Sequence, residues 1–430
     1  MKNKDKTREI IKIGIHKHLL GVTLKEITLM HEKYFKKNNL KNRDKAFIKN
    51  LTMVCIRNRG CIEHILKKYL KKPLPKKLLE IKAILIMGLA QILFTRVENY
   101  AAVNTTVDFF YGRLKKWRAL SNAVLRNVIR EEGFDKKKYD PSIQLPKWLY
   151  NKWKTQYGET GTLNIIDEII QEPYLDLKIK NNFDYWKKEI GGEVLINNTL
   201  RLKKSGDIRE LKGYREGAWW VQNLAAQIPI MLFKNVKDEI VLDICSSPGG
   251  KTAQLLNSGA KVTALDISKI KTELLSNNIK RLNLEKNLKI ITKDFLKWNT
   301  ECKYNKIILD APCSATGTVR KNPDVIWNKK ESDIKRLSKL QILFLEKAIT
   351  LLNKKGILIY CNCSMEYEEG ERIIELLTKN KGIKTLPIKH EEVKFFPKKI
   401  INKGLIRTMP YIYNEISGLE GFFIARLIKI

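Results

Sequence analysis

Two segments of the sequence each place a cysteine just beyond an expected β-strand. Cys313 follows Asp310 by three positions, and Cys363 follows a second apolar run. A thiolate can form a transient covalent bond to an electron-poor carbon, while a second thiol or a carboxylate manages a proton. A free thiol is ionised only slightly at neutral pH, so a reactive cysteine needs a positive or donor-rich setting. The alternative is that both cysteines are small buried apolar residues, as cysteine usually is.

The strands that would carry these residues belong to an alternating pattern in the last part of the chain. After Val236, short apolar or β-branched runs alternate with helical stretches, which is typical of a parallel, doubly wound α/β sheet. We expect strands at residues 240–243, 261–266, 288–292, 306–310 and 356–360. Ligands of such sheets bind at the carboxyl ends of the strands. The residues expected along that edge are Cys245, Asp266, Asp294, Asp310, Cys313 and Cys363.

Residues 243–252 have the pattern of a strand end, a glycine turn and a helix start. Gly249 and Gly250 would let a ligand approach the backbone, and the following helix offers free N–H groups to an anion. A Walker A loop would need glycine where Cys245 stands, and the dinucleotide pattern G-x-G-x-x-G is absent. S-adenosylmethionine remains as the cofactor, because its methionine carboxylate suits the N–H groups.

The ribose of that cofactor needs an acidic acceptor, for which Asp266 is the candidate. Asp266 ends the next expected strand, 23 residues after Asp243, close to the spacing of about 20 residues in a βαβ unit. An acidic residue after a strand is common, so this assignment depends on its combination with the glycine loop. Asp294, after the third strand, would lie near the adenine, and its alternative role is to cap a helix or loop.

The first 138 residues are expected to form an all-helical domain. Apolar residues between Ile81 and Ile92 recur with the spacing of an amphipathic helix, and Ser121 is the candidate N-cap of another. Residues 139–235 are expected to form a small α+β unit with strands near 175–180 and 193–196. Its tryptophans could stack on bases, although large aromatic residues more often fill a core; they are Trp148, Trp153, Trp219 and Trp220.

Composition indicates a folded protein with an acidic partner. Hydrophobic residues make up 43% and charged residues 30% of the 430 positions, which is ordinary for globular domains. Lys and Arg number 82 against 46 Asp and Glu, a net charge of +36, which suits nucleic acid. Alternatively, the abundance of Lys, Ile and Asn reflects a biased genome composition, and part of the positive charge has no role in binding a partner.

The seven cysteines are an odd, scattered set that does not resemble a secreted disulfide framework. The sequence has no CxxC pair, so we expect no zinc or other metal site. Residues 1–20 do not have the pattern of a signal peptide, and the longest mainly apolar stretch, 83–94, is too short to cross a membrane. We therefore expect a cytoplasmic protein without a membrane partner.

The ordered motifs of the last 200 residues resemble the RNA 5-methylcytosine methyltransferase family that includes the Sun/RsmB and NOL/NSUN enzymes. The segments that carry the resemblance are VLDICSSPGGKT, ALDIS, KDF, ILDAPCSATGT, CNCS and GLEGFFIARL. Carbon 5 of cytosine is a poor nucleophile, so its methylation needs a thiolate at carbon 6 and a second group that removes the carbon 5 proton. DNA cytosine methyltransferases resemble the chain less, because they use the cysteine of Pro-Cys as the nucleophile.

The resemblance implies a role for each matching residue. Cys363 would be the nucleophile, Cys313 would assist product release, and Asp310 would also contact the edge of the cytosine. The implied S-adenosylmethionine site consists of Cys245, Ser246, Ser247, Pro248, Gly249, Gly250, Lys251, Asp266, Asp294 and Asp310. The chain departs from the family at three places, which usually have Ala-Ala at 246–247, Asp at Asn223 and Thr at Asn362.

The N-terminal half resembles the NusB-like helical domain of the RsmB branch, in the segments NRDKAFIKNL, KAILIMGLAQILF, AAVN and SNAVLRNVIR. The whole chain is then an all-α NusB-like RNA-binding domain at 1–138, a small α+β RNA-binding subdomain at 139–235 and a Rossmann-like α/β methyltransferase domain at 236–430. That branch modifies cytosine 967 of the small-subunit ribosomal RNA, so this RNA is the implied partner of a monomeric enzyme.

Two alternatives stay open. The same chemistry could act on transfer RNA or another ribosomal site. A different class would be a NusB-like RNA-binding or antitermination protein whose methyltransferase half is inactive, against which the presence of Asp310, Cys313 and Cys363 argues.

Overall fold

The computed structural model describes residues 5–430 apart from 71, 73, 132–138, 204–205, 380–381 and 414–417. The chain forms two compact units, which we call the helical unit and the sheet unit. The helical unit comprises Met1–Gln171 and Lys321–Lys329, and the sheet unit comprises Glu172–Arg320 and Lys330–Ile430. This division differs from the three expected domains, because the helical unit extends past Lys138, which itself lies outside the described residues, and includes a short segment from far along the chain.

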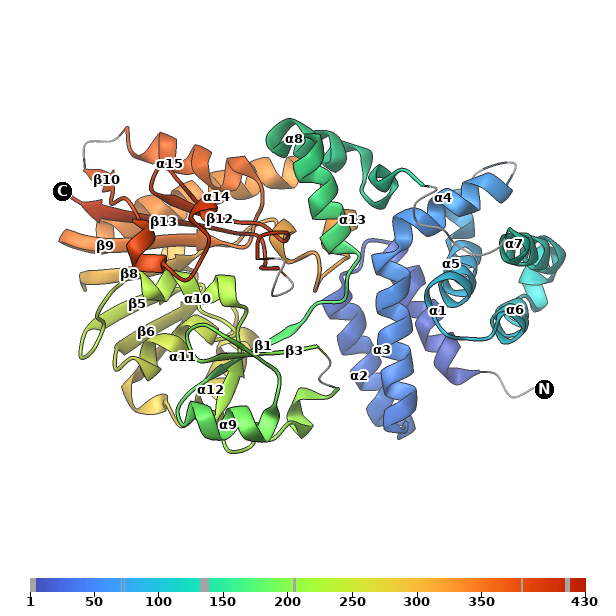
Figure 1. The fold of residues 1–430 in the computed structure, drawn as a ribbon, viewed down its shortest axis with the longest axis horizontal. Helices are drawn as coiled ribbons and strands as arrows, with labels where there is room; N and C mark the ends of the chain where they lie inside the picture. The colour runs from blue at the N-terminus through green and yellow to red at the C-terminus, as the bar shows by residue number, and fades with distance from the viewer. Residues whose placement is uncertain are drawn as a thin grey trace. The chain divides into compact units, whose positions relative to one another are not determined.

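The helical unit is built around α5 (Leu79–Phe94), which packs against α1, α3 and α6. The sequence predicted an amphipathic helix here, but residues on every side of α5 are buried, since helices surround it. Gly88 allows α6 to approach closely, because a Cβ atom there would lie 2.7 Å from the methyl carbon of Thr106. The helices are α1 (Lys6–Leu19), α2 (Leu24–Asn38), α3 (Asn42–Arg57), α4 (Arg59–Tyr69), α6 (Asn99–Val107), α7 (Arg118–Arg130), α8 (Lys147–Ile169) and α13 (Val325–Asn328), shown from blue to green, with α13 in orange, in Figure 1.

The expected N-cap at Ser121 is wrong. A 3-10 turn over Gly112–Trp117 leads directly into α7, so the helix begins at Arg118 and Ser121 lies buried within it. The start signal at Ser121 was overridden because the preceding residues already follow a helical path.

The sheet unit begins with a small antiparallel sheet in the order β2-β3-β1-β4. Its elements are β1 (Leu175–Ile179), α9 (Phe183–Ile190), β2 (Glu193–Leu195), β3 (Thr199–Leu202) and β4 (Trp219–Val221). The side chains of Trp219 and Trp220 are buried, and so is Trp153 in the helical unit. The indole nitrogen of Trp219 donates to the carbonyl of Lys212 at 2.8 Å. These three tryptophans therefore fill cores and are not free to stack on bases.

The large sheet has the order β11-β12-β13-β9-β8-β5-β6-β7, with β10 paired to β13. The strands β5 to β9 are parallel, as the alternating pattern predicted, whereas β10 to β13 run antiparallel to their neighbours. The strands are β5 (Ile240–Ile244), β6 (Lys261–Asp266), β7 (Leu288–Thr292), β8 (Tyr304–Asp310), β9 (Leu352–Asn362), β10 (Ile383–Thr385), β11 (Ile401–Asn402), β12 (Leu405–Thr408) and β13 (Phe422–Lys429). Figure 1 shows β13 between β9 and β12.

Helices pack on this sheet and bury its apolar residues. They are α10 (Leu224–Met231), α11 (Gly250–Asn257), α12 (Lys269–Arg281), α14 (Glu331–Leu351) and α15 (Glu371–Leu377). Phe344 and Leu345 of α14 belong to the same buried cluster as Leu309 and Leu358 of the central strands. Strand order proceeds outward from β5 through β6 to β7 on one side and through β8 to β9 on the other. The reversal between β5 and β8 is where ligands of doubly wound sheets bind.

Candidate active site and cofactor loop

The strand-end residues expected from the sequence all lie at the carboxyl edge of the parallel strands. Asp266 and Asp310 end β6 and β8, Cys245 directly follows β5, Asp294 lies two residues beyond β7, and Cys363 directly follows β9. Cys313 lies three residues beyond β8. Since β5 to β9 are parallel, this placement along one edge is confirmed.

The loop after β5 has the shape that the glycine pattern predicted. Gly249 adopts a φ of 103°, a left-handed conformation that favours glycine, and precedes α11. The backbone N–H of Ser246 donates to the carbonyl of Leu265 at 3.1 Å, and the Pro248 carbonyl accepts from the Asn278 side chain at 2.9 Å. The first N–H groups of a helix have no acceptor within the helix. The start of α11 can therefore bind a carboxylate.

Asp266 lies beside that loop and is almost fully buried. One carboxylate oxygen accepts the backbone N–H of Ser247 at 3.4 Å, and the Lys271 ammonium lies 3.6 Å from the other. These contacts are long, so the carboxylate keeps acceptor capacity for a hydroxyl pair. Ser247 also donates its hydroxyl to the Lys271 carbonyl at 3.0 Å, which accounts for a serine in place of the family's alanine.

Asp294 caps the turn that follows β7. Its carboxylate accepts the backbone N–H of Leu296 at 3.0 Å, and its carbonyl accepts that of Lys297. The capping alternative is thus what the geometry shows. It leaves one carboxylate oxygen of a half-buried side chain for a ligand.

Asp243 is fully buried in β5 beneath the loop. Its Oδ2 accepts the Thr252 hydroxyl at 2.6 Å, while Oδ1 is buried without a hydrogen-bond partner among the described residues. Burial raises the pKa of Asp243 to about 7.

Lys251 and Asp310 form an ion pair that the sequence analysis did not identify. The Lys251 ammonium lies 2.8 Å from Asp310 Oδ2, and the same ammonium lies 5.0 Å from the centre of the Phe422 ring. The lysine side chain is 10% exposed, whereas that of Asp310 is 33% exposed. Burial acts to lower the pKa of Lys251, but the Asp310 carboxylate outweighs it and raises that pKa. The ion pair orients the Asp310 carboxylate and leaves its exposed part available to a ligand.

Cys313 and Cys363 are brought together from different strand ends. Their sulfur atoms lie 3.5 Å apart, within hydrogen-bonding distance, and either thiol can be the donor. This contact with Cys363, together with burial, raises the pKa of Cys313, so Cys313 keeps its proton at neutral pH. Burial also raises the pKa of the Cys245 and Cys361 thiols. Those two residues are consequently poor nucleophiles.

The turn after Cys363 is held by residues that sequence reasoning missed. The Glu369 carboxylate accepts the Ser364 hydroxyl at 2.6 Å and the backbone N–H of Ser314 at 2.9 Å. Asn362, which replaces the family's threonine, accepts the Ser364 N–H at 3.0 Å and donates to the Glu369 carbonyl at 2.7 Å. Ser314 lies 55 positions before Glu369, so the sequence gave no signal of their contact.

Asn223, which replaces the family's aspartate, keeps the capping role that an aspartate would have. It begins α10 by accepting the Ala225 N–H at 2.9 Å, and its amide donates to the buried Asp176 carboxylate at 3.2 Å. Ser246, in place of alanine, donates its hydroxyl to the Leu265 carbonyl at 3.3 Å. Each departure thus gains a hydrogen bond, and the loop geometry is retained.

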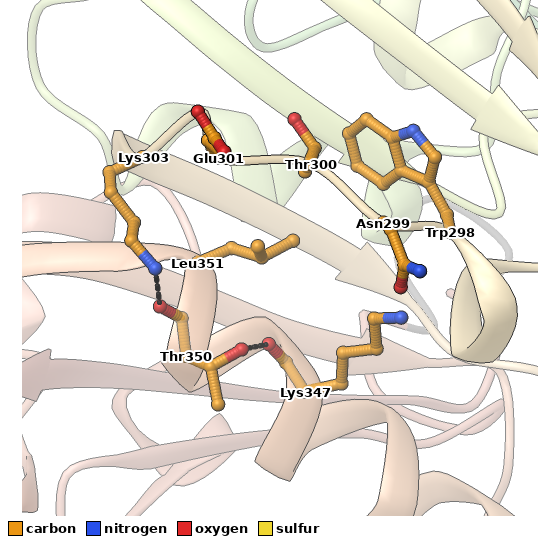
Figure 2. Close-up of a pocket in the computed structure, with 8 residues that line it drawn as sticks. All are labelled: Trp298, Asn299, Thr300, Glu301, Lys303, Lys347, Thr350 and Leu351. Atoms are coloured by element: carbon orange, nitrogen blue, oxygen red, sulfur yellow. Dashed lines mark hydrogen bonds between the residues drawn. The ribbon is translucent and has the colours of Figure 1, made fainter.

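A hollow of about 640 Å³ lies elsewhere on the sheet unit, lined by Trp298, Asn299, Thr300, Glu301, Lys303, Lys347, Thr350 and Leu351. Figure 2 shows the Lys303 ammonium donating to the Thr350 carbonyl, at 2.9 Å. These residues precede β8 and β9, at the amino ends of the strands. The hollow is therefore separate from the edge that carries the thiols.

Within the described ranges, no group of three or more His, Cys, Asp or Glu side chains is arranged to hold a metal ion. In the same part of the chain, no helix combines the length and apolar character that crossing a membrane requires.

A parallel sheet with this strand order, this loop after its first strand and an acidic end to the next strand defines the class of S-adenosylmethionine-dependent methyltransferases. Known proteins agree with that class. The profile of the family described as 16S rRNA methyltransferase RsmB/F matches residues 230–428, and that of the NusB family matches residues 14–130.

Relatives match along most of the chain. The ribosomal RNA small subunit methyltransferase B of Pasteurella multocida is 30% identical over 416 residues, which cover 91% of this chain and 90% of that protein. The protein of that name from Cronobacter sakazakii is 28% identical and covers 85% of this chain and 92% of its own length. The crystal structure of PH0851 has the same fold, with a TM-score of 0.76 and 23% identity over 99% of this chain and 100% of that one. The structure of NSun6 from Pyrococcus horikoshii with SFG has a TM-score of 0.55 and 21% identity, covering 66% and 98%.

The chain belongs to the RsmB/F family of S-adenosylmethionine-dependent RNA methyltransferases, which modify carbon 5 of cytosine, and it carries an N-terminal NusB domain. The family, the fold class and the cofactor predicted from the sequence are thereby confirmed.

Proposed function

We propose that this chain methylates carbon 5 of the cytosine equivalent to position 967 of 16S ribosomal RNA, with Cys363 as the nucleophile. The observation that carries the proposed chemistry is the 3.5 Å separation of the Cys363 and Cys313 sulfurs, and the choice of RNA is supported by the relatives. The curated relatives, which match both units, are small subunit ribosomal RNA methyltransferases. The net charge of +36 suits a ribosomal RNA partner.

The reaction begins when the Cys363 thiolate adds to carbon 6 of the cytosine, which makes carbon 5 nucleophilic. S-adenosylmethionine, when bound, supplies the methyl group as a sulfonium. Transfer of the carbon 5 proton to solvent water then allows the bond between carbon 6 and the Cys363 sulfur to break, which regenerates the thiolate. Cys313 lies next to that leaving sulfur and keeps its proton, so it is placed to assist this release. Asp310, oriented by Lys251, is the candidate contact to the cytosine edge.

The residues present fit the cofactor. The N–H groups of Gly250 and Lys251 at the start of α11 would bind its carboxylate, and the buried Asp266 would accept the ribose hydroxyls. Asp294 would lie near the adenine. The rest of the proposed site is the loop formed by Cys245, Ser246, Ser247, Pro248 and Gly249.

We further infer that residues 1–138 and 139–235 bind RNA, and that the enzyme acts as a cytoplasmic monomer. The NusB profile supports the first of these roles. A transfer RNA or another ribosomal site is the second candidate substrate, because the thiols and the cofactor loop suit any accessible cytosine.

Bisulfite sequencing of ribosomal and transfer RNA, with and without the gene, tests the proposal. Loss of methylation only at the expected 16S cytosine supports it, whereas loss at a transfer RNA cytosine favours the alternative. If purified protein with cofactor present transfers no methyl group to ribosomal RNA or to transfer RNA, the inactive RNA-binding class is favoured.

A further inference from the structure

A single buried carboxylate lies between the loops that carry the two thiols. Glu369 is the last residue of η9 of the sheet unit, a 3-10 turn at Tyr367–Glu369, and its side chain is fully buried. Ser314 and Ser364 directly follow Cys313 and Cys363, and both donate their hydroxyls to Glu369 Oε2. The backbone N–H of Ser314 donates to Oε1 at 2.9 Å. Glu369 thus contacts the neighbour of each cysteine.

Glu369 is also connected by hydrogen bonds to the residues that precede the two cysteines. Gln341 of α14 donates one amide group to Glu369 Oε1 at 2.9 Å and to the Pro312 carbonyl, just before Cys313, at 2.8 Å. The Glu369 carbonyl accepts the Asn362 amide, just before Cys363, at 2.7 Å. Glu369 therefore accepts hydrogen bonds, directly or through Gln341, that connect it to the residues on both sides of each cysteine.

We propose that Glu369 is a positioning residue that sets the separation of the Cys313 and Cys363 sulfurs. The cysteines are half-buried and would contact the reacting base in the proposed mechanism, whereas Glu369 acts only through their neighbours. Its importance for catalysis rests on the proposed function. Its effect on the spacing of the thiols does not, and can be measured without any RNA.

An amide replaces this carboxylate only by rearranging its contacts. Each group that contacts the Glu369 carboxylate donates to it, and the Ser364 hydroxyl oxygen already accepts the Glu366 N–H at 3.0 Å. Because the Ser314 backbone N–H cannot rotate away, the amide hydrogens of Glu369→Gln must point at the two serine hydroxyls. Each hydroxyl then loses the acceptor that now links it to Glu369, which weakens the connection to both loops.

The probe is phenylarsine oxide, whose arsenic bonds two neighbouring thiols and releases its oxygen, with their two protons, as water. Its affinity for the full-length protein would be measured by competition with a small dithiol, and the attachment sites by peptide mass spectrometry. Cys313→Ala and Cys363→Ala should each remove tight binding, which assigns the pair. Glu346→Gln is the matched control, because Glu346 is an exposed carboxylate on α14 of the same unit.

We expect Glu369→Gln to bind the arsenical about tenfold more weakly than Glu346→Gln, and to lower kcat by about tenfold or more with an unchanged cofactor KM, because a misplacement of about 1 Å can cost about a hundredfold in rate. A purely structural role would lower the unfolding midpoint but leave the affinity of folded protein unchanged. Should Glu369→Gln fail to fold, Ser364→Ala, which removes one link and keeps the carboxylate, is read in the same two assays.

The proposal is overturned if the wild type does not bind the arsenical through both cysteines, or if the variant matches Glu346→Gln in affinity. It is also overturned if affinity falls while kcat does not. If the wild type methylates no RNA, the proposed function fails, and the affinities alone decide whether Glu369 sets the spacing.

Discussion

The Cys313 and Cys363 sulfurs lie 3.5 Å apart, although the two residues are separated by 50 positions and follow different strands. A backbone bond reinforces this approach, since the Gly317 N–H donates to the Cys363 carbonyl at 2.9 Å. Thiols that merely filled a core would not need to meet at the ligand-binding edge of the sheet. The pair suits a reaction in which one sulfur forms a bond that the other helps to break.

The first prediction separates the two cysteines, because the mechanism gives them opposite kinetic signatures. Cys363→Ala removes the nucleophile, so no covalent adduct with RNA should form. Cys313→Ala should still attack and transfer the methyl group but release the product poorly, and the enzyme should stay bonded to methylated RNA. A denaturing gel with labelled RNA and cofactor would show that adduct as a slower band.

The substrate in this assay should be the natural RNA, because the target cytosine must leave any stack, at a cost of a few kcal/mol. Cys302→Ala is the matched control, since Cys302 is exposed and precedes β8, at the opposite end of that strand from Cys313. An adduct with Cys363→Ala and none with Cys313→Ala would reverse the two roles and bring the chemistry closer to that of the DNA enzymes.

The second prediction concerns the cofactor. Asp266→Ala should weaken S-adenosylmethionine binding by about 1.5 to 3 kcal/mol, the value of a hydrogen bond to a charged group, while the unfolding midpoint changes little. Isothermal titration calorimetry measures the affinity. Glu273→Ala, on the nearby helix α12, provides the control for loss of a negative charge. Unchanged affinity of Asp266→Ala would remove this residue from the proposed site.

The third prediction concerns the ion pair of Lys251 and Asp310. Lys251→Met would leave the Asp310 carboxylate without its partner, so we expect a loss of about 1 to 3 kcal/mol in unfolding free energy, toward the low end because Asp310 is partly exposed. The kcat of methyl transfer should fall as well, since Asp310 loses its orientation. Lys269→Met, an exposed lysine on α12, should change neither quantity. Equal stability of the two variants in urea would contradict the prediction.

The parallel core could be predicted from the sequence because short β-branched runs between helices have few other solutions. Strand ends were harder to predict. The strand β9 begins at Leu352, four residues before the expected Gly356, and the register of β9 with β8 shifts between Tyr304 and Lys306, an irregularity that the sequence pattern does not show. The strand β13 was not predicted, since an apolar run such as Phe422–Lys429 does not reveal its antiparallel partner.

The candidate site could be predicted where strand topology alone determines position. The carboxyl ends of neighbouring parallel strands lie at the same edge of a sheet, so Asp266, Asp310 and Cys363 could be predicted to lie along one edge. Contacts made by loops were not predictable, because the path of a loop depends on its packing. The pair formed by Lys251 and Asp310 and the bonds of Glu369 are of this kind.

The fourth prediction concerns the segment Lys321–Lys329, which lies in the helical unit although it follows the Cys313 loop in sequence. The Asp324 carboxylate accepts the buried N–H of Leu24 at the start of α2 at 2.9 Å, and the Arg59 guanidinium lies 4.7 Å from the Trp327 ring. Asp324→Ala should cost the helical unit about 1 to 3 kcal/mol, because a buried N–H loses its acceptor.

Asp324→Asn keeps an acceptor oxygen at the same distance from the backbone and should lose much less unfolding free energy. It is therefore the matched control for the alanine variant. Urea unfolding followed by circular dichroism at a helical wavelength measures both variants. If alanine and asparagine destabilise the protein equally, the hydrogen bond to Leu24 does not support α2.

The fifth prediction follows from the buried Asp243. Burial raises its pKa to about 7 in the folded protein, above the value of 3.8 that it has when exposed. The folded state therefore binds more protons than the unfolded state between about pH 4 and 7, and this group lowers stability as the pH rises through that window.

Asp243→Asn cannot ionise and retains an acceptor for the Thr252 hydroxyl. The unfolding free energy of the variant should rise relative to that of the wild type by on the order of 3 kcal/mol from pH 4 to pH 7. Denaturant unfolding at several pH values measures this difference. A difference between the two proteins that stays constant over this range would mean that Asp243 is already ionised at pH 4.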